Sequence, residues 1–212
     1  MKVAIFDFDG TIYKHETFTL FMNHLKQAYP KRYRKFFTRI LPIYLGYKAK
    51  VVPEKKMKHL MMYHYAQAIN DLSSDAQHEF FEDIFKQMEG QFHEEVLQRI
   101  QSHRAAGFHT MIVSGAFTIL LDIFKELYGI DSVIGTNLPG KNEPLDHIHA
   151  ENKTTAIFAY SDSSTIDWEE SFAYGDSIED RNILELVGNP VAVYPDHALA
   201  ALAQKNKWNI LS

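Results

Sequence analysis

Short apolar segments alternate with helical patterns in the second half of the chain, and this alternation constrains the fold more than any other feature. Apolar runs at 110–113, 171–174 and 191–194 are each followed by residues with the spacing of an amphipathic helix. Strands separated by helices of about 10–15 residues are typical of a parallel sheet that helices cover on both faces. The pattern therefore predicts an α/β fold with a doubly wound, Rossmann-like parallel sheet.

A long helical segment separates the first predicted strand from the others. Residues 3–6 are apolar and lead into a polar turn at Asp7. From Glu16 to about residue 90, apolar residues recur at helical spacing and no strand pattern is present. Further along, a short apolar run and a loop with proline and glycine predict a hairpin over 132–150. We expect an α/β core at 1–14 and 91–212, with an all-helical cap domain inserted at 15–90.

Composition excludes several classes of protein. The 212 residues are 46% hydrophobic and 23% charged, as in globular chains and unlike disordered ones. The chain has no cysteine, which excludes a disulfide scaffold and a cysteine nucleophile. Its net charge of −5 argues against a chain that binds nucleic acid through an overall basic character. No apolar stretch reaches the length of a membrane span, about 20 residues, so we expect a soluble, cytoplasmic protein.

Positive charge is concentrated in the predicted cap. Residues 31–58 contain ten basic residues and one acid, Glu54, which gives this segment a charge of +9. Aromatic residues are interleaved with the basic ones. The segment could be a solvated helix face whose aromatic residues form the cap core, a site that holds an anionic substrate, or a surface for nucleic acid or anionic membrane. We favour the solvated face and expect neither nucleic acid nor membrane as a partner, because the acidic remainder of the chain repels polyanions.

Carboxylates, hydroxyls and a lysine lie at or near the ends of the predicted strands. Ligands of open α/β sheets bind outside the carboxyl ends of the strands, so we expect these side chains to converge. Converging carboxylates suit a hard cation such as Mg²⁺. A hydroxyl and a backbone N–H at the start of a helix suit an anion, and the set as a whole suits phosphoryl transfer. The residues are Asp7, Asp9, Gly10, Thr11, Ser114, Gly115, Lys153, Asp176 and Asp180.

Each group taken alone also has a purely structural interpretation. A pair such as Asp7 and Asp9 occurs at strand ends in many unrelated proteins. Ser114 fits a simple turn from strand to helix, and Lys153 fits the solvated first turn of a helix. Asp176 fits a cap for the helix that follows it. The order of these groups along the chain therefore carries more weight than any one of them.

That order resembles the haloacid dehalogenase superfamily of phosphohydrolases, whose four motifs are all present. Runs such as His103-Arg104-Ala105-Ala106-Gly107 look like subfamily IB, the phosphoserine-phosphatase-like branch. The resemblance covers nearly the whole chain and implies an α/β core with a helical cap inserted after the first strand. It is specific for the superfamily but not for a substrate. The motifs are Asp7-Phe8-Asp9-Gly10-Thr11, Ile112-Val113-Ser114-Gly115, Lys153 and Gly175-Asp176-Ser177-Ile178-Glu179-Asp180.

The resemblance implies roles for four catalytic residues. Asp7 would be the nucleophile that forms an aspartyl-phosphate, and Asp9 would be the general acid and base. Ser114 and Lys153 would stabilise the negative charge of the phosphoryl group. Asp180 would position Lys153 or a water molecule.

The resemblance also implies a magnesium site and a phosphate site. The carboxylates of Asp7 and Asp176 and the backbone carbonyl of Asp9 would hold Mg²⁺. A glutamate that contacts substrate in the phosphoserine-phosphatase-like branch corresponds to Glu16, although Glu16 also fits the positive end of the first cap helix. The substrate and phosphate contacts would come from Asp9, Gly10, Thr11, Ser114, Gly115, Lys153 and Glu16.

These inferences favour an enzyme. We expect a Mg²⁺-dependent hydrolase of a small phosphorylated metabolite, present as a monomer or homodimer. Two alternatives remain open: a phosphomutase or phosphotransferase of the same fold, and a catalytically idle phosphate-binding module.

Overall fold

The computed structural model describes residues 1–140, 143–150, 152–160 and 165–212, and it divides into two compact units. The first unit contains the sheet and comprises Met1–Glu16, Met88–Thr136 and Ile148–Ser212. The second comprises Thr17–Gln87 and Asn137–His147. None of the helices within the described ranges has the length and hydropathy that a membrane span requires.

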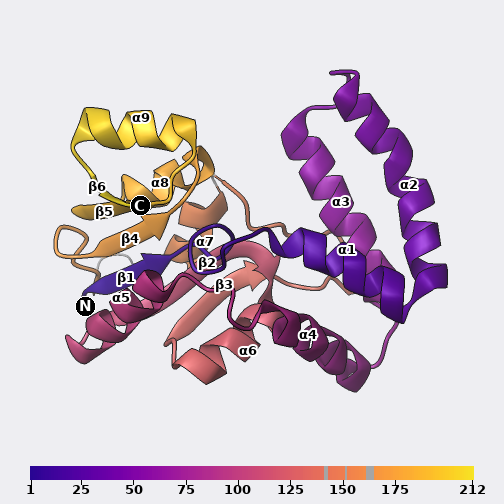
Figure 1. Cartoon of the computed structure of the whole chain (residues 1–212), viewed down its shortest axis with the longest axis horizontal. Coiled ribbons are helices and arrows are strands. Elements are labelled where there is room, and N and C mark those ends of the chain that lie inside the picture. Colours follow the sequence, from indigo (N-terminus) through magenta and orange to yellow (C-terminus); the bar gives the residue numbers. More distant parts are fainter. Residues whose placement is uncertain (141–142, 151, 161–164) are drawn as a thin grey trace. The chain divides into compact units, whose positions relative to one another are not determined.

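A parallel sheet of six strands forms the centre of the first unit, in the order β3-β2-β1-β4-β5-β6 (Figure 1). Its central strand pairs with neighbours on both sides, since Ile5 lies opposite both Met111 and Ala173. The predicted doubly wound α/β fold is confirmed. The strands are β1 (Val3–Phe6), β2 (His109–Phe117), β3 (Ser132–Thr136), β4 (Phe172–Gly175), β5 (Asn189–Val193) and β6 (Asn209–Leu211).

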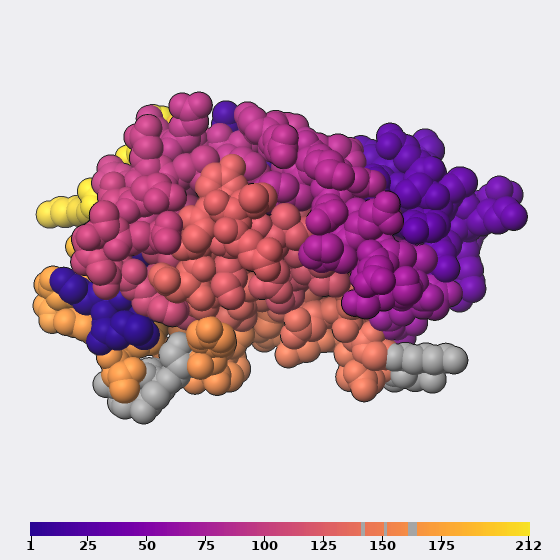
Figure 2. All heavy atoms as spheres, turned by 90° about the horizontal axis from the view of Figure 1, so that it is seen from below, coloured from indigo at the N-terminus to yellow at the C-terminus, as the bar shows by residue number. Residues whose placement is uncertain are grey.

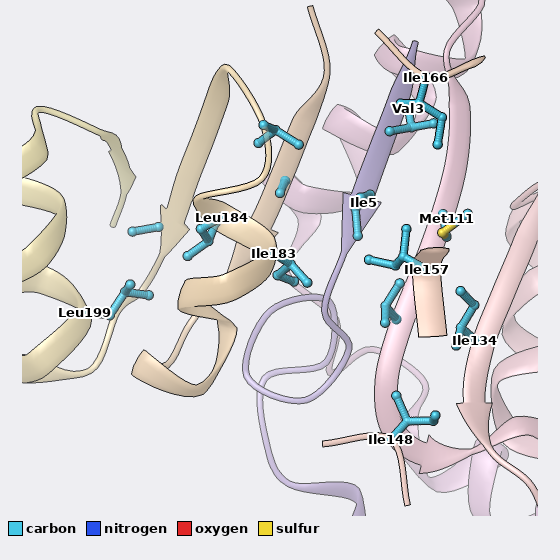
Figure 3. Packing of buried hydrophobic residues seen from close by; sticks show 14 of the residues in the cluster. Val3, Ile5, Met111, Ile134, Ile148, Ile157, Ile166, Ile183, Leu184 and Leu199 are labelled. Carbon is cyan, nitrogen blue, oxygen red and sulfur yellow. The ribbon is translucent and has the colours of Figure 1, made fainter. Parts of the chain in front are cut away.

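Helices cover both faces of this sheet because successive side chains of a strand point to opposite faces. Val3 and Ile5 of β1 pack with Ile157 of α7 and Ile183 of α8 (Figure 3). On the opposite face, the Phe6 ring stacks on Tyr174, and the side chains of α5 and α6 cover the surface that Figure 2 shows in magenta and coral. The helices are α5 (Glu94–Ala105), α6 (Thr118–Tyr128), α7 (Asn152–Tyr160), α8 (Arg181–Leu184) and α9 (His197–Asn206), with a short 3-10 helix at Ile178–Asp180.

The second unit is helical and has an aromatic core. The Tyr65 hydroxyl donates a hydrogen bond to the Phe21 carbonyl at 2.9 Å, and the rings of Phe36 and Phe21 pack around Tyr65. A large buried polar tip thus finds a partner inside the apolar core. The helices are α1 (Thr17–Ala28), α2 (Pro30–Lys48), α3 (Glu54–Ile69) and α4 (Ser74–Met88).

The hairpin expected over 132–150 is wrong for the described part of that range. β3 pairs in parallel with β2, and 137–140 and 143–150 contain no strand. Pro139 and Pro144 lack the N–H that a strand ladder needs. The chain instead returns to the end of β3, where the Ile148 N–H donates to the Thr136 hydroxyl at 3.2 Å. Residues 137–140 and 143–147, expected in the α/β core, belong to the helical unit, where the rings of His147 and His59 lie 6.1 Å apart.

A buried histidine links α5 to the sheet. The ring nitrogen Nε2 of His103 lies 2.7 Å from the Tyr174 hydroxyl, and His103 is buried among Phe6, Phe108 and Phe172. Burial lowers the pKa of His103 below its ordinary value of 6.5, and the charge of Arg99 lowers it further. The folded protein therefore holds this imidazole neutral.

We predict that His103 makes stability fall as pH falls below 6.5. Between its ordinary and its lowered pKa the unfolded chain binds a proton that the folded chain does not, so the free energy of unfolding decreases. The His103→Gln variant should be less stable than the wild type at about pH 7.5, and the difference should shrink towards about pH 5. Urea unfolding at both pH values measures it, with the exposed His78→Gln as the control. A difference that stays constant with pH would contradict the prediction.

Candidate active site

Asp7 is held rigidly at the carboxyl end of the central strand. Its backbone N–H donates to the Tyr174 carbonyl of β4 at 2.9 Å, and the residue is 5% exposed. β1 lies between β2 and β4, where the strand order reverses, which is where open α/β sheets bind ligands. Phe8 is fully buried, whereas Asp9 is partly exposed. Asp9 is therefore more accessible to solvent than Asp7, although both follow the same strand.

One glycine lets the loops after β1 and β4 approach each other closely, and a second lets the loop after β4 fold back on itself. Gly10 has a φ of +73°, and a Cβ at this position would overlap the carboxylate of Asp176. A Cβ at Gly175 would lie 2.6 Å from the Cβ of Asp180. Both positions therefore require glycine, Gly10 for its conformation and for space, Gly175 for space.

Hydrogen bonds fix the loop that follows β4. Ser177 and Asp180 form a capping box, in which each side chain accepts from the other residue's backbone N–H. The Asp196 N–H donates to the Asp176 carbonyl at 2.8 Å. Thr11 approaches from the β1 side, with its hydroxyl 3.4 Å from Asp176 Oδ1. Asp176 and Asp180 are therefore held in place before any ligand binds.

Lys153 joins the carboxylates of two different loops. It lies in the first turn of α7, and its Nζ is 2.6 Å from Asp7 Oδ1 and 2.6 Å from Asp180 Oδ1. All three side chains are buried. The sequence prediction that Lys153 converges with these carboxylates is correct in its geometry.

Several carboxylates lie close together in this site, and burial and mutual repulsion shift the pKa values of Asp7 and Asp176. Burial raises the pKa of Asp7 well above its ordinary value, and Asp180 and Asp176 add to the rise while Lys153 opposes it. Burial also raises the pKa of Asp176 to about 7, and the charges of Asp180 and Glu16 contribute. The pKa of Lys153 is raised because the two carboxylates outweigh its burial. Three carboxylates around one ammonium group leave negative charge that calls for a further cation.

The carboxylates are spaced to hold a metal ion. One oxygen each from Asp7, Asp176 and Asp180 lies within 4.8 Å of the others. Carboxylate oxygens are ligands that Mg²⁺ prefers. Both oxygens of Asp180 accept hydrogen bonds, Oδ1 from Lys153 and Oδ2 from Ser177, whereas the hydrogen bonds from Lys153 to Asp7 and from Thr11 to Asp176 go to Oδ1. Asp7 and Asp176 are therefore the better available ligands. The residues present therefore fit Mg²⁺, as the resemblance implied.

Strand β2 is interrupted near its carboxyl end by a polar turn at Ser114 and Gly115, and the strand continues past the predicted end at Val113. The pairing of β2 with β3 shifts register between Val113 and Phe117, which interrupts the ladder around Ser114 and Gly115. Ser114 is buried, and its Oγ accepts from the Ala116 N–H at 3.2 Å. Thr136 anchors this turn by donating to the Gly115 carbonyl at 2.8 Å. A turn of this kind can present backbone N–H groups and a hydroxyl to an anion.

Glu16 is the last residue of the segment Met1–Glu16, which belongs to the unit that contains the sheet. It is exposed, and its charge contributes to the raised pKa of Asp176. The structure thus brings its charge into the electrostatic range of the carboxylates, but Glu16 is not one of the clustered metal-site residues.

His93 supports the first motif in a way that the sequence does not reveal. Its backbone N–H donates to the Ile12 carbonyl at 2.9 Å, and its imidazole forms a hydrogen bond with the Gly10 backbone. The ring also stacks on Tyr194, with centroids 4.3 Å apart. Tyr194 itself has a φ of +40° in the turn after β5. No spacing or motif connects these positions, because the fold alone brings together segments that are far apart in sequence.

We predict that Gly10→Ala abolishes cation binding without unfolding the protein. Mg²⁺ should raise the thermal unfolding midpoint of the wild type, since a ligand that binds the folded state stabilises it. An alanine at position 10 displaces Asp176, so this rise should disappear. Gly90→Ala is the matched control, because Gly90 has a φ of +75° but no atom near its Cβ position. It should lose about 1 kcal/mol of stability and keep the full response to Mg²⁺. An intact Mg²⁺ response in Gly10→Ala would refute the geometry.

Comparison with solved structures finds the same fold in other proteins. A Bordetella pertussis Tohama I protein of unknown function has a TM-score of 0.82 at 16% identity, covering 100% of this chain and 98% of that one. The apo form of a phosphoserine phosphatase has a TM-score of 0.65 at 18% identity, covering 99% and 92%. At these identities the likeness shows the fold.

Sequence comparison identifies the family. A histidinol-phosphatase of Neisseria meningitidis serogroup C (strain 8013) is 30% identical over 123 residues, 53% of this chain and 55% of that protein. The chain spans about half the length of the curated relatives it matches. The model of the haloacid dehalogenase-like hydrolases matches residues 4–185, which include all four motifs. The chain therefore belongs to the haloacid dehalogenase-like hydrolase family.

Proposed function

We propose that this chain is a Mg²⁺-dependent phosphomonoester hydrolase that acts on a small phosphorylated metabolite through an aspartyl-phosphate on Asp7. The observation that carries the proposal is the ion-paired cluster in which Lys153 Nζ lies 2.6 Å from both Asp7 and Asp180, beside Asp176. Such a cluster can position a nucleophile and offset the charge of a phosphoryl group. Positioning and charge stabilisation account for most of the catalysis of phosphoryl transfer.

Asp7 supplies the nucleophile in this proposal. Lys153 favours the ionised form of Asp7 against its burial. A cation held by Asp7 and Asp176 would favour that form further, so Asp7 needs no activating base. An oxygen of its carboxylate forms a bond to phosphorus while the bond from phosphorus to the substrate alcohol breaks. A water molecule then attacks the acyl phosphate, which releases inorganic phosphate and restores the free carboxylate.

Asp9 moves the protons. It is two residues beyond the nucleophile and more accessible than Asp7. In its protonated form it gives a proton to the leaving alcohol, and the resulting carboxylate then takes a proton from the attacking water. Gly10 and Thr11 hold this turn against Asp176.

The remaining groups hold the phosphoryl oxygens. Ser114 and the Gly115 N–H bind them at the turn within β2, and the Lys153 ammonium offsets their charge. Asp7, Asp176 and the Asp9 carbonyl would hold Mg²⁺, which when bound neutralises the negative charge of the carboxylates and of the substrate. Asp180 positions Lys153 through its 2.6 Å contact.

The substrate class is a small phosphate monoester. The names of the Neisseria histidinol-phosphatase and of the phosphoserine phosphatase both denote hydrolases of small phosphorylated compounds. Glu16 is exposed and electrostatically coupled to Asp176, which supports a contact with the substrate. Release of free phosphate, measured over a panel that includes histidinol phosphate and phosphoserine, separates a hydrolase from a phosphomutase or phosphotransferase.

We predict that activity depends strictly on a divalent cation. Phosphate release should vanish in EDTA and return when Mg²⁺ is added, because the clustered carboxylates repel the phosphate until a cation neutralises them. Ca²⁺ should restore little activity, since it favours a larger and looser coordination shell. The assay is phosphate release from the best compound of the panel, with Asp7→Asn as the blank. Undiminished turnover in EDTA would overturn the assignment of the site.

We also predict that substitutions of the two aspartates of the first motif affect the reaction in different ways. Asp7→Asn should abolish turnover and the covalent intermediate, because the nucleophile is lost. Asp9→Asn keeps the backbone carbonyl and should retain slow turnover, lower by about 10²–10⁴ in rate. Mass spectrometry of acid-quenched protein should find phosphate on Asp7 in the wild type. Phosphate on Asp9, or none on Asp7, would contradict these roles.

A further inference from the structure

Helix α2 has two apolar faces, and only one of them is buried. Phe36 and Ile40 pack inside the helical unit, with exposures of 1% and 4%. Phe37, Leu41, Tyr44 and Leu45 follow one another at intervals of four, three and one residues, so they form a second face, yet they are 40–56% exposed. The expectation that the aromatic residues of this segment form the cap core is therefore only half right.

The exposed apolar face continues into the connection between α2 and α3. These helices lie side by side and are joined by a short turn (Figure 1). The Val51 and Val52 N–H groups both donate to the Gly46 carbonyl, which ties the turn to the end of α2. Val51 is 77% exposed, the most exposed of the large apolar residues. We call the side chains of Phe37, Leu41, Tyr44, Leu45 and Val51 the α2–α3 apolar surface.

Exposed basic side chains occur in the same segment as this surface. Arg34, Lys48, Lys50 and Lys56 are exposed, and Lys48 Nζ lies 5.4 Å above the Tyr44 ring. Glu54 is the single acid between residues 31 and 58, and it pairs with Lys58 at 3.3 Å. The combination of exposed leucine, valine and aromatic side chains with several exposed basic side chains is typical of segments that lie in the interface of an anionic bilayer.

We propose that the α2–α3 apolar surface binds the surface of an anionic lipid bilayer. This departs from the expectation that the acidic remainder of the chain excludes a membrane, because charges on exposed surfaces are screened within about 8 Å at physiological salt and the +9 segment acts locally. A second copy of the chain fits less well, because a two-fold interface places the same +9 segment against itself. Nucleic acid also fits less well. It complements the lysines and stacks on aromatic rings, but it offers nothing apolar to Leu41, Leu45 and Val51. A bilayer complements both parts, with acyl chains for the apolar groups and anionic headgroups for the lysines.

Vesicle flotation tests this proposal on the full chain. The wild type should bind vesicles of phosphatidylcholine with about 30% phosphatidylglycerol and bind pure phosphatidylcholine much more weakly. Binding should weaken as salt rises from about 0.1 M to about 0.5 M, because headgroup attraction is screened. The assay needs no substrate, so its outcome is independent of the proposed phosphatase activity.

A pair of matched variants locates the surface. Leu45→Ser with Lys48→Gln removes one exposed apolar group and one lysine from α2, and should weaken binding about tenfold or more. Leu127→Ser with Lys205→Gln removes the same groups from exposed positions of α6 and α9, and should bind like the wild type. Thermal unfolding of both variants verifies that they fold.

Four results would overturn the proposal. The first is an absence of vesicle binding by the wild type, and the second is equal loss of binding in both variants. The third is binding of short single-stranded DNA without binding of vesicles. The fourth is a wild-type dimer, seen by light scattering, that the α2 variant alone converts to a monomer.

Discussion

The contacts of Lys153 with Asp7 and Asp180 are the interaction on which the site depends. Charges this deeply buried are tolerated only when they are paired, and removal of one partner of such a pair costs about 3–5 kcal/mol. The ammonium group joins the end of β1, the start of α7 and the loop after β4 at 2.6 Å contacts. The same pairing fixes the direction of the Asp7 carboxylate. Burial of these charged groups therefore costs stability, and they are the same groups that the proposed chemistry requires.

The backbone geometry allows the three carboxylates and the lysine of the site to lie close together. β1 lies at the reversal of strand order, so loops from both neighbouring strands meet at its end. Gly10 leaves room for the Asp176 carboxylate of the neighbouring loop, and Gly175 leaves room for Asp180 within the loop after β4. The Asp176 carbonyl and the Asp180 carboxylate are held by bonds from Asp196 and Ser177. The site is preorganised, which is what electrostatic catalysis requires.

The helical unit shows a different balance between burial and exposure. Its core rests on aromatic contacts around Tyr65, whose hydroxyl finds a backbone partner. Helix α2 supplies Phe36 and Ile40 to this core, but its second apolar face remains in solvent. Since exposed apolar groups contribute nothing to the stability of the unit, this face is better explained by an interaction than by folding.

The sequence by itself determined the class of fold and pointed to the residues of the candidate site. Alternating apolar periods predicted the parallel sheet, and acidic residues after two of the strands predicted the convergence of Asp7 and Asp176, because parallel strands end at a common edge. Lys153, at the start of a helix, was added by its place in the order of the motifs. Only the tertiary structure decided the rest. Residues 137–140 and 143–147 belong to the helical unit instead of forming a hairpin. His93 reaches Gly10 and Tyr194. Such contacts join segments far apart in the chain, so no local pattern encodes them. The sequence likewise predicted that the aromatic residues of the basic segment form the cap core, but packing buries Phe36 and leaves Phe37 and Tyr44 exposed.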